Sequence, residues 1–171
     1  MTHPRWFLTL LCLVLLAGPL AAEQPEQRST VVFLVRHAEK AAEPKEDPPL
    51  SERGRERAAR LAELLGEAGV TALYATEWRR TQDTLKPLAE RLQRSVRVLP
   101  AKDDAAFARA IRAERGGVVV VAGHSNTLGP ILEALGAAPI AEIADTDYDN
   151  LFMATLTPAG EVRVVRLRWS P

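Results

Sequence analysis

The chain has 171 residues, and its 22 Lys and Arg balance 22 Asp and Glu, so the formal net charge is zero. That balance argues against nucleic acid as a partner and favours a small molecule over a polymer. The length suits one domain with a substantial core. The only cysteine is Cys12, so the chain beyond it has no thiol chemistry and no disulfide.

The first 22 residues have the pattern of a secretory signal. His3 and Arg5 form a basic start, residues 6–17 are apolar, and Ala21 and Ala22 supply small residues for cleavage. An uncleaved anchor is the alternative, but the apolar run is shorter than the roughly 20 residues of a membrane span. We therefore expect a signal peptide at 1–22, one domain at 23–171, and a periplasmic or secreted protein. The mature chain is expected to have no membrane span, and the sequence carries no signal for an oligomeric state.

Strand and helix patterns alternate along the remaining chain. Apolar runs predict strands at 30–35, 70–74, 96–99 and 118–122. Helical spacing predicts helices after Ser51, over 77–94, after Asp103 or Asp104, and over 127–135. Residues 151–157 and 161–169 flank a Pro-Ala-Gly turn and predict an antiparallel hairpin. These elements predict an α/β fold, a three-layer sandwich whose mainly parallel sheet carries helices on both faces.

Two histidines follow strongly predicted strands. Arg36-His37 ends the first strand, and Gly123-His124-Ser125-Asn126 follows the fourth. Ligands bind at the carboxyl ends of strands in open α/β sheets, so we expect these residues to share one site. A neutral histidine can attack phosphorus while arginines hold the phosphate oxygens. The alternatives are an Arg-His pair that makes only surface hydrogen bonds and a loop histidine beside an ordinary helix cap.

Three short motifs resemble those of the histidine phosphatase superfamily, in the branch that includes the cofactor-dependent phosphoglycerate mutases. They are Arg36-His37-Ala38-Glu39-Lys40, Arg80-Thr81-Gln82-Asp83-Thr84 and Gly123-His124-Ser125-Asn126. The resemblance extends over nearly all of the chain beyond the signal and implies a phosphoglycerate mutase-like fold. It also implies phosphate binding by Arg36 and Arg80, transfer of the phosphoryl group to His37, and a pocket completed by His124 and Asn126. It implies no metal and no cofactor.

The choice of Arg80 over Arg79 depends on Thr84, because the family's second arginine is followed four residues later by threonine. Ala38 and Asp83 depart from the usual family residues without altering the four pocket residues.

The general acid is the open position in this resemblance. Mutase-like members supply a glutamate after the second arginine, whereas the corresponding stretch here offers Asp103 and Asp104. We predict Asp104 as the acid, with Asp103, Glu39 and the acidic loop 145–149 as alternatives. Both aspartates are also natural helix caps.

The resemblance implies a phosphatase that hydrolyses phosphate monoesters through a phosphohistidine on His37. A protein phosphohistidine phosphatase and a non-catalytic phosphate-binding module are the alternatives. Trp78 and Trp169 lie in apolar patterns and are predicted to pack in the core or at its edge, and Lys40 is predicted to be a surface lysine.

Overall fold

The computed structural model describes residues 28–170, so the predicted signal peptide at 1–22 lies outside the described residues. The sheet has six strands in the order β3-β2-β4-β1-β5-β6. The strands are β1 (Thr30–Arg36), β2 (Ala72–Thr76), β3 (Val96–Leu99), β4 (Val118–Gly123), β5 (Asn150–Leu156) and β6 (Val162–Arg168). The first four are mutually parallel where they pair, whereas β5 runs antiparallel to β1 and forms a hairpin with β6. The predicted α/β fold with a mainly parallel sheet is confirmed.

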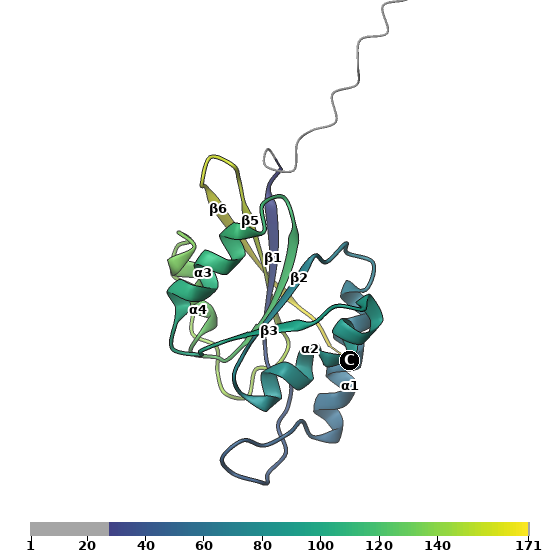
Figure 1. Cartoon of the computed structure of the whole chain (residues 1–171). Helices are drawn as coiled ribbons and strands as arrows, with labels where there is room; N and C mark the ends of the chain where they lie inside the picture. The colour runs from purple at the N-terminus through teal and green to yellow at the C-terminus, as the bar shows by residue number, and fades with distance from the viewer. Residues whose placement is uncertain (1–27, 171) are drawn as a thin grey trace, which may run out of the picture.

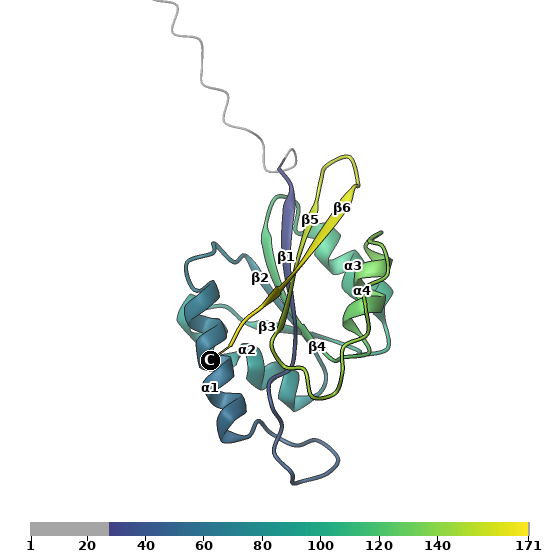
Figure 2. The ribbon, with the colours of Figure 1, turned by 180° about the vertical axis from the view of Figure 1, so that it is seen from behind.

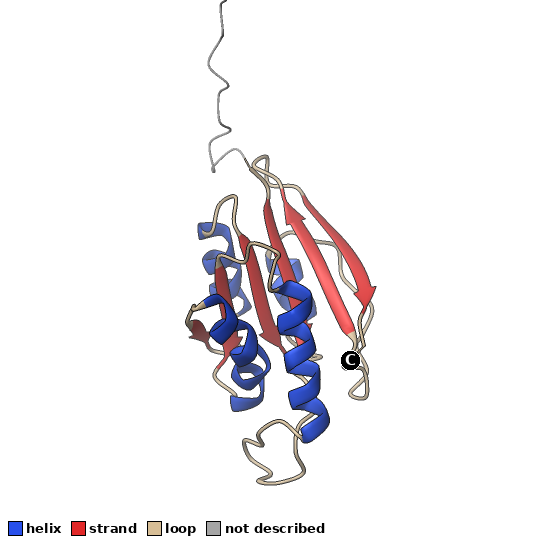
Figure 3. Ribbon diagram, turned by 90° about the vertical axis from the view of Figure 1, so that its right-hand side faces the viewer, coloured by secondary structure: helices blue, strands red, loops and turns tan. Residues whose placement is uncertain are grey.

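Four helices cover the two faces of the sheet: α1 (Glu52–Leu65), α2 (Arg79–Leu92), α3 (Asp104–Ala113) and α4 (Leu128–Ala134). Helices α3 and α4 lie on one side and α1 and α2 on the other (Figures 1 and 2). The β5–β6 hairpin extends the sheet at one edge (Figure 3). The layers therefore match the predicted sandwich.

The burial of the central strand β4 on both faces explains why its sequence is continuously apolar. Val119 and Val121 belong to the core beneath α3 and α4, whereas Val120 and Ala122 belong to the core beneath α1 and α2. Successive side chains of a strand point to opposite faces, so a strand buried on both faces needs apolar residues throughout.

Helix boundaries follow from local capping. The Ser51 hydroxyl accepts a hydrogen bond from the amide of Gly54, as its predicted N-cap role requires. Helix α2 begins at Arg79, later than predicted, because Trp78 has an extended backbone. The carboxylate of Asp47, in the proline-rich loop 41–49, accepts a hydrogen bond from the Arg79 amide at 3.0 Å.

No helix within residues 28–170 has the length and apolarity needed to cross a membrane.

The segment after His37 lies directly on the first turn of α1. A Cβ atom at Gly54 would stand 2.1 Å from the carbonyl oxygen of Glu39, and this backbone oxygen cannot move aside cheaply. The Glu39 carboxylate is paired with buried Arg57 through two hydrogen bonds, of 2.9 and 2.8 Å. Both contacts tie α1 to the chain that carries the first histidine.

We expect Gly54→Ala to lower the free energy of unfolding by about 1–3 kcal/mol, because the methyl group overpacks a backbone contact. Gly129→Ala, in α4, is the matched control, since its Cβ would meet Ile140 at an ordinary 3.5 Å. Chemical denaturation of both variants measures the difference. Equal stabilities would contradict the close approach at Gly54.

Candidate active site

The two histidines meet because β1 and β4 are neighbours in the sheet. Arg36 is the register partner of Gly123, and the His37 amide donates a 2.9 Å hydrogen bond to the Gly123 carbonyl. The next residue along β4 is His124, and the centroids of the two imidazoles lie 5.2 Å apart. Strand pairing thus brings together two motifs that are 87 positions apart in sequence, as the two numbers show.

A cavity of about 790 Å³ opens above these strand ends. Its lining comprises Arg36, His37, Lys40, Trp78, Arg80, Ala101, Lys102, His124, Ser125, Asn126, Thr127, Glu142, Ile143, Asp145 and Tyr148. All four residues predicted to form the phosphate pocket are present, together with Asn126.

The structure separates Arg80 from Arg79. Arg80 lines the cavity, whereas the exposed Arg79 side chain pairs with Asp83 on the surface of α2. Thr84 is buried, and its hydroxyl accepts a 2.9 Å hydrogen bond from the amide of Ala38. The threonine that distinguished the two arginines in the sequence therefore supports the chain immediately after His37.

The imidazole of His37 has a defined tautomer. Its Nδ1 lies 2.8 Å from the carbonyl oxygen of Ala38. A carbonyl can only accept, so Nδ1 carries the hydrogen and Nε2 keeps its lone pair. Burial lowers the pKa of His37 to about 3, and the neighbouring charges of His124, Arg36 and Arg80 lower it too, against the opposing effect of the Ala38 hydrogen bond. His37 is therefore neutral at pH 7, with a nucleophilic nitrogen.

His124 is held from both sides of its ring. Its Nε2 lies 2.9 Å from the Thr76 hydroxyl, and its Nδ1 lies 3.4 Å from a terminal nitrogen of Arg80. Burial, followed by the positive charge of Arg80, lowers the pKa of His124 to about 4.

Both cavity arginines contact an aromatic ring, and each also has an Nε–H group without a hydrogen-bond acceptor among residues 28–170. Arg36 donates to the Ala144 carbonyl at 2.9 Å and stacks over the Tyr148 ring at 4.4 Å. Arg80 stacks over the Trp78 ring at 4.9 Å. The Nε atoms of both guanidinium groups are buried and have no hydrogen-bond partner among residues 28–170. An unsatisfied buried donor is costly, so the site favours an anion with several acceptor oxygens.

Residues 32–104 match the profile of the histidine phosphatase superfamily (branch 1), and this segment includes Arg36, His37 and Arg80. The match spans 73 of the 171 residues, and in this segment the chain is similar to members of the histidine phosphatase superfamily. No curated protein sequence matches the chain.

Solved structures of this superfamily have the same fold. The protein histidine phosphatase SixA, complexed with tungstate, is 21% identical over 81% of this chain and 96% of that chain, with a TM-score of 0.64. A mycobacterial glucosyl-3-phosphoglycerate phosphatase is 18% identical over 84% and 99% of the two chains, with a TM-score of 0.60. The phosphoserine phosphatase of Entamoeba histolytica is 11% identical over 82% and 98%, with a TM-score of 0.65. At these identities the likeness establishes the fold.

The carboxylates near the cavity differ in whether they line it and in what they contact. Asp103 caps α3 by accepting a 2.8 Å hydrogen bond from the Ala106 amide, and neither Asp103 nor Asp104 is among the lining residues. Burial favours a raised pKa for Glu39, but its hydrogen bonds with Arg57 outweigh burial and lower it. The carboxylates that do line the cavity are Glu142 and Asp145. The assignment of Asp104 as the acid stays a prediction.

Three residues at the site were not predicted from the sequence to belong to it. Trp78 was expected to pack in the core or at its edge and not at the site, and it is 36% exposed at the cavity, whereas Trp169 is buried. Tyr148 lies in the acidic loop, where its aromatic ring was the available signal. Thr76 ends β2 beside His124, and its place in the site could be inferred only from the strand order.

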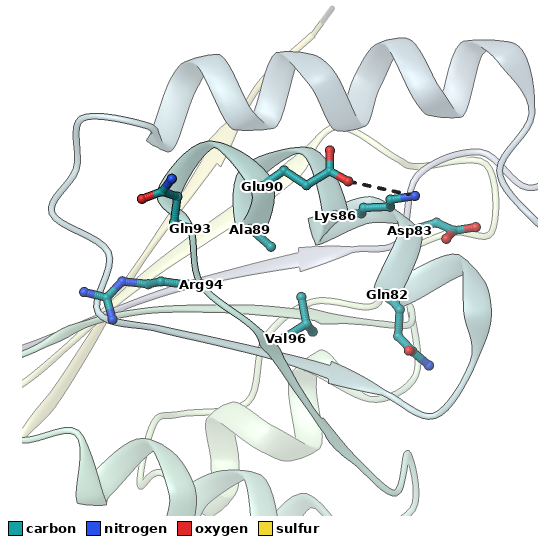
Figure 4. Close-up of a pocket in the computed structure, with 8 residues that line it drawn as sticks. All are labelled: Gln82, Asp83, Lys86, Ala89, Glu90, Gln93, Arg94 and Val96. Atoms are coloured by element: carbon teal, nitrogen blue, oxygen red, sulfur yellow. Dashed lines mark ion pairs between the residues drawn. The ribbon is translucent and has the colours of Figure 1, made fainter.

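A second cavity, of about 400 Å³, lies between α2 and the start of β3 (Figure 4). Its lining includes Lys86 and Glu90, which pair with each other at 3.9 Å, and none of the predicted site residues. Within residues 28–170, no group of three His, Cys, Asp or Glu side chains is arranged to hold a metal ion.

The low pKa of His37 predicts that stability falls in acid. Between pH 6.5 and about 3 the unfolded chain binds a proton at this position that the folded protein does not, so the free energy of unfolding rises with pH in that range. We expect His37→Asn to reduce the slope by at most about 1.4 kcal/mol per pH unit, the value for one proton. Denaturation with urea at several pH values measures it. An unchanged slope would show that His37 is protonated in the folded protein.

Proposed function

We propose that this protein is a phosphatase that hydrolyses phosphate monoesters through a phosphohistidine on His37. The observation that supports this most directly is the lone pair on Nε2 of a neutral His37, in a cavity that is also lined by the buried Arg36 and the half-buried Arg80. Nucleophile and cations are the parts that phosphoryl transfer through a covalent intermediate requires.

The reaction proceeds in two displacements. His37 Nε2 forms a bond to phosphorus as the ester P–O bond breaks, and the departing oxygen takes up a proton. Water then attacks phosphorus, the N–P bond breaks, and inorganic phosphate and neutral His37 are released. Arg36 and Arg80 bind the non-bridging oxygens throughout, because a planar guanidinium matches the geometry of a phosphate edge.

Wild-type protein is expected to turn over p-nitrophenyl phosphate and to form an acid-labile phosphoenzyme, and His37→Asn is expected to lose both. Arg80→Ala should lower kcat by about 10²- to 10³-fold, since it removes a donor to the transition state. Arg79→Ala is the matched control and should retain activity, because that side chain points to the surface of α2.

Steady-state kinetics and rapid acid quench measure these outcomes. If the wild-type protein binds phosphate but turns over no ester, the phosphate-binding module is the correct interpretation. Turnover without a labelled His37 would exclude the covalent intermediate.

The arrangement of carboxylates favours a second candidate substrate, a protein phosphohistidine. Asp103 is a helix cap, Glu39 is held by Arg57, and Asp145 contacts Arg36 at 3.4 Å and Ser125 at 3.0 Å. These three carboxylates each contact another residue of the chain, and Glu142 is the further carboxylate that lines the cavity. A nitrogen leaving group depends less on a positioned acid than an alcohol does.

A direct comparison of leaving groups distinguishes the two substrate classes. For the phosphohistidine phosphatase, kcat/KM is expected to be at least about 10-fold higher on a phosphohistidine peptide than on glycerol phosphate, and unchanged in Asp104→Asn and Asp145→Asn. For a monoesterase whose general acid is Asp104 or Asp145, the Asn variant of that aspartate is expected to lose activity on glycerol phosphate. The same variant is expected to keep its activity on p-nitrophenyl phosphate.

We also propose that the protein is exported to the periplasm or beyond the cell, with residues 1–22 as a cleaved signal. The basic start, the apolar run and the small residues at Ala21 and Ala22 support this. Cell fractionation followed by N-terminal sequencing tests it. An intact Met1 in the cytoplasmic fraction would contradict export.

A further inference from the structure

A chain of hydroxyl groups leads from His124 into the protein behind the active site. His124 Nε2 lies 2.9 Å from the Thr76 Oγ1, and this oxygen lies 2.9 Å from the Thr81 Oγ1. The Thr81 hydroxyl lies 2.7 Å from the carbonyl oxygen of Trp78 and 3.1 Å from that of Thr76. Both threonine side chains are fully buried, so water does not compete for these hydrogen bonds.

The direction of this chain is set at its inner end. A carbonyl oxygen cannot donate, so the Thr81 hydroxyl donates to a backbone carbonyl and its oxygen is left to accept from Thr76. The only hydrogen of the Thr76 hydroxyl is then used, and Thr76 can only accept from His124. His124 therefore carries a hydrogen on Nε2.

The outer end of the chain requires the same direction. Nδ1 of His124 faces a terminal nitrogen of Arg80 at 3.4 Å. A guanidinium only donates, so Nδ1 must present its lone pair to Arg80. Two independent neighbours, a backbone carbonyl and an arginine, thus select one tautomer of His124.

We propose that Thr76 and Thr81 are positioning residues that keep the hydrogen on Nε2 of His124, so that His124 gains and loses protons at Nδ1, beside Arg80. Neither threonine lines the cavity, so both act through His124. When a phosphoryl group enters, the proton that His124 takes up forms an N–H at Nδ1, on the Arg80 side of the ring. Nε2 keeps its hydrogen in both protonation states. The effect on turnover rests on the phosphatase function proposed above, whereas the tautomer does not.

Long-range ¹H–¹⁵N correlation NMR of the labelled full chain at pH 7 tests the tautomer without any substrate. The chain has three histidines, so substitution of each by Asn assigns their signals. We expect a pyrrole-type nitrogen at Nε2 and a pyridine-type nitrogen at Nδ1 of His124. The opposite pattern in the wild-type protein would overturn the proposal, whether or not the protein is a phosphatase.

Variants of the two threonines test the positioning role. Thr81→Val frees the Thr76 hydrogen to turn toward Nε2, so it should increase the Nδ1–H tautomer of His124. Thr76→Val removes the acceptor, so it should give a mixture of tautomers and lower kcat on p-nitrophenyl phosphate by roughly 10- to 100-fold, since an orienting partner acts through the histidine that it fixes. Thr76→Ser should restore both properties.

Thr71→Val is the matched control. Thr71 precedes β2, at the end opposite Thr76, and its hydroxyl donates to the Val118 carbonyl at 3.0 Å. It should change neither the tautomer nor kcat. A loss of kcat in Thr76→Val or Thr81→Val without a change of tautomer would indicate a merely structural role and overturn the proposal. If Thr76→Val fails to fold, the wild-type tautomer and Thr81→Val decide the question.

Discussion

The parallel pairing of β1 with β4 is the constraint on which the rest of the site depends. It places the carboxyl ends of two buried strands side by side, and the amide of His37 bonds to the carbonyl of Gly123 across the pair. β2 pairs with β4 on its other side and ends at Thr76. Three strand ends therefore supply His37, His124 and the Thr76 hydroxyl that contacts His124, and the helix after β2 supplies Arg80.

Burial gives these groups their chemistry. The two imidazoles lose their charge because desolvation disfavours the protonated form, while guanidinium groups remain charged at physiological pH. The loop before β5 supports Arg36 through the Ala144 carbonyl and the Tyr148 ring. Neutral nitrogen acceptors beside fixed cations with unsatisfied N–H groups make a cavity suited to an oxyanion. No bound metal is required for that electrostatic balance.

The same packing limits how a leaving group receives a proton. Glu39 follows the nucleophile closely in sequence, yet its carboxylate turns to Arg57 and joins β1 to α1. Asp145 lies at the cavity but interacts with Arg36 and Ser125. The loop before β5 contributes Glu142, Ile143, Asp145 and Tyr148 to the lining of this cavity.

The sequence by itself determined the α/β fold, the element order, and the candidate pocket of Arg36, His37, Arg80 and His124. Those conclusions were accessible because apolar periodicity, capping residues and short motifs are local properties. Only the tertiary structure decided the tautomers of His37 and His124, the exposure of Trp78, and the pairing of Glu39 with Arg57. Each of these depends on contacts between segments distant in the chain, and side-chain direction and burial have no local signature. The hydrogen bond from the Arg79 amide to Asp47 is likewise a contact between segments distant in the chain.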